Sequence, residues 1–148
     1  TLKEFVIDAA TNSAFQAWKE IVEDNCKLFL LCDKGAKKTA NAHFVKILCW
    51  WSKLDKKIKT FNMDSNDTDG TSMACAHAIQ HALSQLFGGE ENILAILFGQ
   101  ATDSGGGGTC NSFFKELTKL GLSSSSESYL KAFCTLHCIQ LTLQNPIS

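Results

Sequence analysis

Two aspartates each close an apolar run of the kind that forms a buried strand. Asp33 ends the run LFLLCD at residues 28–33, and Asp103 ends ILAILFGQATD at residues 93–103. If these strands are neighbours in one sheet, the two carboxylates meet at one edge. Paired carboxylates hold Mg2+ or Mn2+, and such ions serve phosphoryl transfer. We therefore predict that Asp33 and Asp103 are catalytic and metal-binding residues; the alternative is that each aspartate only starts a turn.

A glycine-rich loop, DSGGGGT at residues 103–109, connects the second run to a predicted helix. Backbone amides at the N-terminus of a helix can bind an anion, so we predict phosphate or DNA contacts at Ser104, Gly105, Gly106 and Thr109. The loop has neither the GxGxxG nor the GK[ST] pattern of nucleotide-binding loops. A flexible linker beside a metal site is the alternative interpretation.

Cys134 and His137 form a CTLH motif at the end of the last strand-like segment. Both side chains could point to the same sheet edge, with Cys110, Cys138 or His43 as a third ligand for zinc. The spacing specifies no complete ligand set, so zinc is not a predicted cofactor. We favour a packed cysteine and a histidine that makes a hydrogen bond near the active edge.

Lysines concentrate around Asp33. Residues 27–59 carry nine lysines against two aspartates, a local net charge of +7, in a chain whose net charge is -1. Such a segment could bind a polyanion, and we predict DNA contacts at Lys34, Lys37 and Lys38; a solvated pair of strands is the alternative. All 14 basic residues are lysines, so contacts to DNA would reach the backbone and read little sequence.

The composition fits one globular domain, with 148 residues of which 45% are hydrophobic. No apolar stretch approaches membrane-spanning length and the N-terminus lacks the layout of a signal peptide, so we expect an intracellular protein without a membrane partner. The seven cysteines are scattered and include no CxxC pair, which favours reduced thiols. The chain begins without Met, so we expect a piece of a longer protein.

The elements that must position these residues follow from the hydrophobic periodicity. An amphipathic helix is predicted over 11–24, capped by Thr11 or Ser13. Short connections suited to hairpins then join three predicted strands into an antiparallel meander. These strands cover residues 27–32, 42–51 and 57–63.

The second half of the chain alternates helices and strands. A helix over 71–87 has Asp69 or Thr71 as its cap and ends at Gly88. A uniformly apolar strand at 93–98, a helix at 109–120, a strand at 129–134 and a helix from about 136 follow. We therefore predict an α/β fold with a mixed five-stranded sheet, helices on both faces, and the first and fourth strands adjacent and parallel.

Three further patterns favour structural roles. His77 and His81 share a helix face but lack the glutamate of HExxH, which indicates a surface or core pair. Trp50 and Trp51 are adjacent in a strand, so at most one of them can face solvent and stack on a base. A small acidic cluster (Asp64, Asp67 and Asp69) lacks the rest of a calcium loop and is interpreted as a solvated turn with helix caps.

This order of elements, with acids after the first and fourth strands, resembles the ribonuclease H-like fold of DDE transposases and integrases. It is most similar to the hobo/Activator/Tam3 (hAT) type, in which a first Asp on strand one and a second Asp followed by small residues precede a CxxH motif. Asp33, Asp103 with SGGGGT, and CTLH at residues 134–137 occur here in that order. The resemblance implies that residues 1–25 are a helical extension of a core over 26–148.

The resemblance implies metal-dependent cleavage and joining of DNA strands, with two acids and a third, a Glu, around two Mg2+ ions. No acid follows His137 here, so we expect the chain to be incomplete or inactive as it stands. DNA as a partner, a homodimer and a nuclear location are further implications. Two alternatives stay open: a domesticated transposon-derived module that binds DNA or protein without catalysis, and a phosphate-binding α/β domain.

Overall fold

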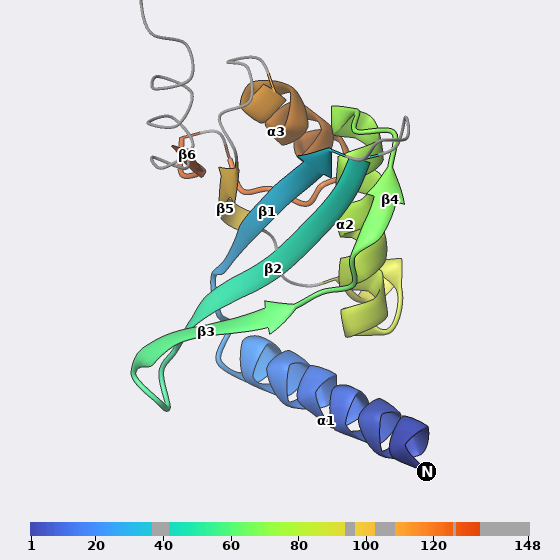
Figure 1. The fold of residues 1–148 in the computed structure, drawn as a ribbon. Coiled ribbons are helices and arrows are strands. Elements are labelled where there is room, and N and C mark those ends of the chain that lie inside the picture. Colours follow the sequence, from blue (N-terminus) through green and yellow to red (C-terminus); the bar gives the residue numbers. More distant parts are fainter. Residues whose placement is uncertain (37–41, 94–96, 103–108, 126, 134–148) are drawn as a thin grey trace, which may run out of the picture.

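The computed structural model describes residues 1–36, 42–93, 97–102, 109–125 and 127–133 (Figure 1). Helices and short strands alternate along the chain after an opening meander. In chain order the elements are α1 (Leu2–Glu23), β1 (Leu28–Ala36), β2 (Ala42–Ser52), β3 (Lys57–Asn62), β4 (Asn66–Thr68), α2 (Ser72–Phe87), η1 (Glu90–Asn92), β5 (Leu97–Thr102), α3 (Thr109–Lys119) and β6 (Leu130–Phe133).

The strands form one mixed sheet of six strands with the order β3-β2-β1-β5-β6, and the short β4 pairs with β2 off this path. β1, β2 and β3 are antiparallel neighbours, which confirms the predicted meander. β5 is parallel to β1, and β6 is parallel to β5. The predicted α/β class, and the side-by-side parallel placement of the first strand and the strand after α2, are therefore confirmed.

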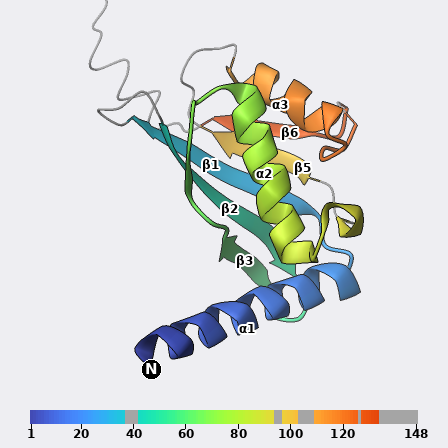
Figure 2. The same cartoon turned by 90° about the vertical axis from the view of Figure 1, so that its right-hand side faces the viewer.

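The described helices lie on one face of the sheet. Even-numbered residues of β1 and β2 point into the core, and Leu28, Leu30, Phe44, Lys46, Leu48, Trp50 and Ser52 are buried. The Phe44 ring meets Phe113 of α3 edge to face, with 6.5 Å between ring centroids. Figure 2 shows α2 and α3 side by side over this face, with α1 crossing below them. The prediction of helices on both faces is not met among the described elements, and the helix expected from about residue 136 lies outside them.

The boundaries of two helices follow from local chemistry. The Thr71 hydroxyl accepts a hydrogen bond from the Ala74 amide, and Gly88 ends α2 in the left-handed conformation at φ 76, as predicted. The predicted start of the first helix at Thr11 or Ser13 is wrong, because Thr1 caps the helix in a capping box with Glu4. Residues 2–10 contain no Gly or Pro, so the helix predicted over 11–24 continues toward the N-terminus and begins at Leu2.

Three strands also differ from prediction. β1 continues through Asp33 to Ala36, and the SNDTDG segment, predicted as a turn, contributes the short β4. The strand predicted at residues 93–98 lies later in the chain, at Leu97–Thr102. Its buried Gln100 accepts a hydrogen bond of 2.8 Å from the Tyr129 hydroxyl, which satisfies a polar group inside the sheet.

Gly99 permits the close pairing of β5 with its two neighbours. A Cβ atom there would lie 2.8 Å from the Leu130 carbonyl oxygen and 2.9 Å from Cδ1 of Phe29. The first of these contacts is to backbone, so a strand would have to shift. We expect Gly99→Ala to destabilise the protein by about 1–3 kcal/mol in urea unfolding.

Ala101→Gly, two residues further along the same strand face, is the matched control. It removes a methyl group instead of adding one and should cost only about 0.5–1 kcal/mol. A Gly99→Ala protein as stable as the wild type would contradict the tight packing of the three strands.

Candidate functional site

The predicted carboxylate edge is built on the parallel pair β1 and β5. Leu31 lies opposite Ala101 in the register of the two strands, so both strands run in the same direction toward the same edge. Asp33 lies two residues beyond Leu31 in β1, and β5 ends at Thr102. The first predicted aspartate is thus placed at the edge where open sheets bind ligands.

Asp33 differs from the prediction in its setting. It lies inside β1 rather than after it, because β2 continues alongside and pairs Val45 with Asp33. Its side chain is exposed, on the face of the sheet that none of the described helices covers. The carboxylate is therefore held on hydrogen-bonded backbone while it stays open to water and ions.

Most of the other predicted site residues lie outside the described residues: Asp103, Ser104, Gly105, Gly106, Lys37, Lys38, Cys134 and His137. Lys34 belongs to β1 and pairs with Phe44 of β2. Thr109 is the first residue of α3, as the predicted anion-binding loop requires. The structure therefore places Asp33, Lys34 and Thr109, and it does not test how the remaining residues group around them.

Thr102 is a residue of this edge that the sequence did not single out. Its hydroxyl is buried and has no hydrogen-bond partner among the described residues. It is the last residue of β5, on the strand that neighbours Asp33. Ala101 shares the sheet face of Leu31 and Asp33, so the next residue, Thr102, directs its hydroxyl to the opposite, covered face and does not join the Asp33 carboxylate in one ligand set. Within the described ranges, no group of three His, Cys, Asp or Glu side chains could hold a metal ion.

A second polar constellation lies between β2, β4 and the start of α2. Lys46 is completely buried in β2, where its ammonium contacts the Asn66 side chain and lies 3.7 Å from Asp64. Burial lowers the pKa of Lys46 below its ordinary value, and Asp64 partly opposes that shift. Asp64 is thus a partner of a core lysine while its own side chain stays exposed to solvent.

Two histidines line a hollow beside this constellation. The hollow, of about 480 Å3, is bordered by Asp64, Asp67, His77 and His81 among others. Asp67 lies 3.1 Å from Nδ1 of His43, and both α2 histidines are exposed. Of the two predicted alternatives, a surface or a core pair, the structure therefore shows the surface pair.

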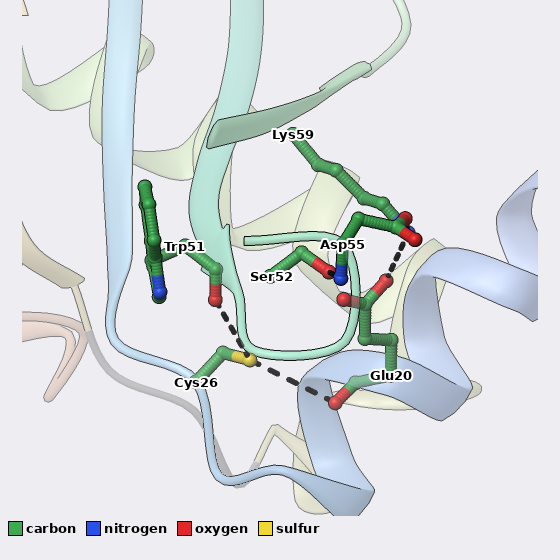
Figure 3. Close-up of polar contacts among 6 residues, drawn as sticks. All are labelled: Glu20, Cys26, Trp51, Ser52, Asp55 and Lys59. Atoms are coloured by element: carbon green, nitrogen blue, oxygen red, sulfur yellow. Dashed lines mark hydrogen bonds and ion pairs between the residues drawn. The ribbon is translucent and has the colours of Figure 1, made fainter. Parts of the chain in front are cut away.

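The far end of the sheet is tied to α1 by a network centred on Lys59 (Figure 3). Its ammonium lies 2.8 Å from Glu20 and 2.6 Å from Asp55. Hydrogen bonds from Lys59 hold the pKa of both carboxyl groups below their usual values. Cys26 reaches the Trp51 carbonyl at 3.7 Å, and burial raises the pKa of this thiol. This network therefore fixes α1 to the end of the sheet formed by β2 and β3.

The tryptophan pair divides as predicted, with Trp50 buried at 3% and Trp51 exposed at 55%. Cys26, Cys32, Cys49 and Cys75 are thiols rather than disulfides.

No model of a known protein family matches the chain, and comparison with curated proteins found no similar sequence. None of the helices in the described ranges is long and apolar enough to cross a membrane.

The buried lysine makes a testable contribution to stability. Its ammonium is desolvated, so we expect Lys46→Met to raise the free energy of unfolding by about 1–2 kcal/mol at neutral pH. The lowered pKa means that the folded state binds the proton less tightly than the unfolded chain does. The penalty for burying the charge is therefore full below the folded pKa and falls as pH rises toward the ordinary value of 10.5. The difference in free energy of unfolding between the Met variant and the wild type should therefore become smaller as pH rises from neutral toward 10.5, and urea unfolding at the two pH values measures it.

Asp64→Ala provides the second side of a double-mutant cycle. It should destabilise the wild type by about 1 kcal/mol, since Lys46 loses its ion pair, and should have almost no effect when Lys46 is Met. Equal costs in the two backgrounds would show that Asp64 and Lys46 do not interact.

Proposed function

We propose that the chain is part of a transposase-type catalytic core for metal-dependent cleavage and joining of DNA strands. The observation that carries this proposal is the parallel pairing of β1 with β5. It brings Asp33 to the edge where the chain leaves β5 at Thr102, directly before Asp103. A carboxylate within β1 beside one that directly follows β5 is suited to hold divalent ions for phosphoryl transfer.

The sheet supports the ribonuclease H-like form of this proposal. An antiparallel meander continues into two parallel strands, each reached through a helical segment, and the first strand is central. The exposed position of Asp33 also fits a substrate as large as DNA, since the carboxylate does not lie in a closed pocket.

In the proposed mechanism, Asp33 and Asp103 would hold Mg2+ or Mn2+, and the ion would supply Lewis-acid activation of a hydroxide or 3' alkoxide nucleophile. Lys34, Lys37 and Lys38 bind DNA phosphates beside this edge, and Ser104, Gly105, Gly106 and Thr109 offer amides or hydroxyls to a phosphate at the start of α3. A third acid from the same protein would complete the ligand set. By this proposal the protein acts on DNA in the nucleus.

A second candidate is a domesticated module that binds DNA or protein without catalysis. The exposed apolar side chains of the uncovered sheet face, Trp51 and Ile58 among them, favour it. The two candidates differ in their response to metal, because only the catalytic core needs a divalent ion at Asp33.

Metal binding tests the catalytic proposal. Millimolar Mg2+ or Mn2+ should raise the melting temperature of the wild-type chain by about 2–4 °C, since an ion that binds only the folded state stabilises it. Asp33→Asn should abolish that rise, because the amide carries no charge. The measurement is a thermal melt of each protein with and without metal.

Asp67→Asn is the matched control, because Asp67 belongs to the histidine-lined hollow and lies away from β5. It should keep the metal-induced rise. Loss of the rise in Asp67→Asn, with retention in Asp33→Asn, would move the metal site to the hollow and contradict the proposal.

DNA binding tests the role of the lysines. Affinity for a labelled duplex should fall steeply with salt, and Lys37→Ala with Lys38→Ala should reduce the log–log slope by about 2, since each phosphate contact contributes about 0.9. The control pair is Lys115→Ala with Lys119→Ala on α3, which should leave the slope unchanged. Equal slopes for both pairs would exclude the predicted contact surface.

A further inference from the structure

The first half of α1 is an exposed helical arm. Every residue from 1 to 13 is exposed to solvent, and the helix packs on the core through the buried Ala17 and Ile21, with the partly buried Trp18 and Val22 beside them. In Figures 1 and 2 the N-terminal end of α1 projects past the sheet and away from the other elements. The arm carries four large apolar side chains that are more than half exposed: Leu2, Phe5, Val6 and Ile7.

The second surface is the sheet face on which none of the described helices packs, which we call the open face. It consists of the odd-numbered residues of β1 and β2 with their cross-strand partners in β3, β5 and β6. Trp51 pairs with Ile58 at one end of this face, and Gly99 pairs with Leu130 toward the other. Its exposed large side chains are Leu31, Val45, Trp51, Ile58 and Leu130.

Together these two surfaces hold nine of the twelve large hydrophobic side chains that are exposed in the described part of the chain. Monomeric proteins rarely leave contiguous apolar patches of this kind in water. We propose that the arm of one copy of this chain packs on the open face of a second copy, and that the exchange is reciprocal. This inference does not depend on the carboxylate site.

The dimensions of the two surfaces agree. Twelve helical residues, 2–13, span about 18 Å at 1.5 Å per residue, and the spacings of about 4.8 Å between the five strands of the open face add up to about 19 Å. An amphipathic helix can therefore cross the open face from Ile58 to Leu130, at the Phe29 end of β1, and leave Asp33 exposed.

Charge also favours a second copy. The arm carries two carboxylates, Glu4, which the N-terminal ammonium holds at 2.6 Å, and Asp8, while Lys27 lies over the Phe98 ring at the β1–β5 end of the sheet and Lys56 is exposed in the β2–β3 turn. The carboxylates of the arm would thus approach a basic border.

Symmetry makes the exchange self-limiting. Each copy has one arm and one open face, so a two-fold axis that swaps the arms satisfies both surfaces in a closed dimer. The arm leaves the body in a direction that does not return to its own open face (Figure 2).

The test is the oligomeric state of the 148-residue chain, measured by sedimentation across a wide range of concentrations. We expect a dimer for the wild type and monomers for Phe5→Glu and Ile58→Glu. Both side chains are about 70% exposed, so these substitutions should leave the fold intact, which circular dichroism checks. Leu54→Glu and Met73→Glu are the controls, since both residues are exposed but lie outside the two surfaces; both should remain dimers.

A mixture of the two monomeric variants separates arm exchange from other symmetric dimers. The Ile58→Glu variant keeps a wild-type arm, and the Phe5→Glu variant keeps a wild-type open face. The arm of the first can pack on the face of the second, so the mixture should form a heterodimer although each variant alone is a monomer. A monomeric wild type would overturn the proposal. A dimer that only one of the two substitutions breaks would also overturn it, because it would indicate that helix pairs with helix or sheet with sheet. An open-ended series of larger species would overturn it too, because reciprocal exchange gives a closed dimer.

Discussion

The parallel hydrogen bonding of β5 to β1 is the contact on which the rest of this structure depends. It joins the antiparallel meander to the second half of the chain, and it places the ends of two distant segments at one edge. The pairing requires Gly99, because Phe29 and the Leu130 backbone leave no room for a side chain there. It also requires a partner for the buried amide of Gln100, which Tyr129 provides. The proposed function depends on this strand pair, because it would bring a second carboxylate beside Asp33.

The two faces of the sheet have different roles because only one is covered by the described helices. The covered face holds the core, including the buried Lys46. Desolvation of its ammonium lowers the stability of the fold, but its contact with Asp64 anchors the segment that leads into α2. The open face keeps Asp33 accessible and also leaves Trp51 and Ile58 in water. A face left open for a large substrate also leaves apolar side chains in water, which is unfavourable. A second copy of the chain packed on Trp51 and Ile58 would remove those side chains from water.

Periodicity and turn chemistry predicted most of the elements. The alternation in β2, the caps at Thr71 and Gly88 and the apolar run of β1 each depend on local sequence, so they were found. β4 was missed because a polar segment pairs with β2 through its backbone, a long-range contact without an apolar signature. β5 was placed four residues early because small and polar residues such as Gly99 and Gln100 are poor strand formers unless neighbours enclose them.

The candidate site was predictable only in part. Adjacent parallel strands followed from two uniformly apolar runs, but the extension of β1 beyond Asp33 depends on β2 and left no local trace. The burial of Lys46 did have a local sequence signal, since Lys46 alternates with Phe44 and Leu48 on the core face. Its charge argued against burial, so the signal was not used. Thr102 acquires its unpaired hydroxyl only from tertiary packing.

The most direct test of the account is to locate bound Mn2+ by its paramagnetic broadening of backbone amide signals in NMR spectra. If β1 and β5 form the metal edge, substoichiometric Mn2+ should first broaden the amides of Cys32, Asp33, Ala101 and Thr102. Broadening that begins instead at Asp64, Asp67 and His77, with the β1 and β5 signals unchanged, would contradict a metal site at this edge.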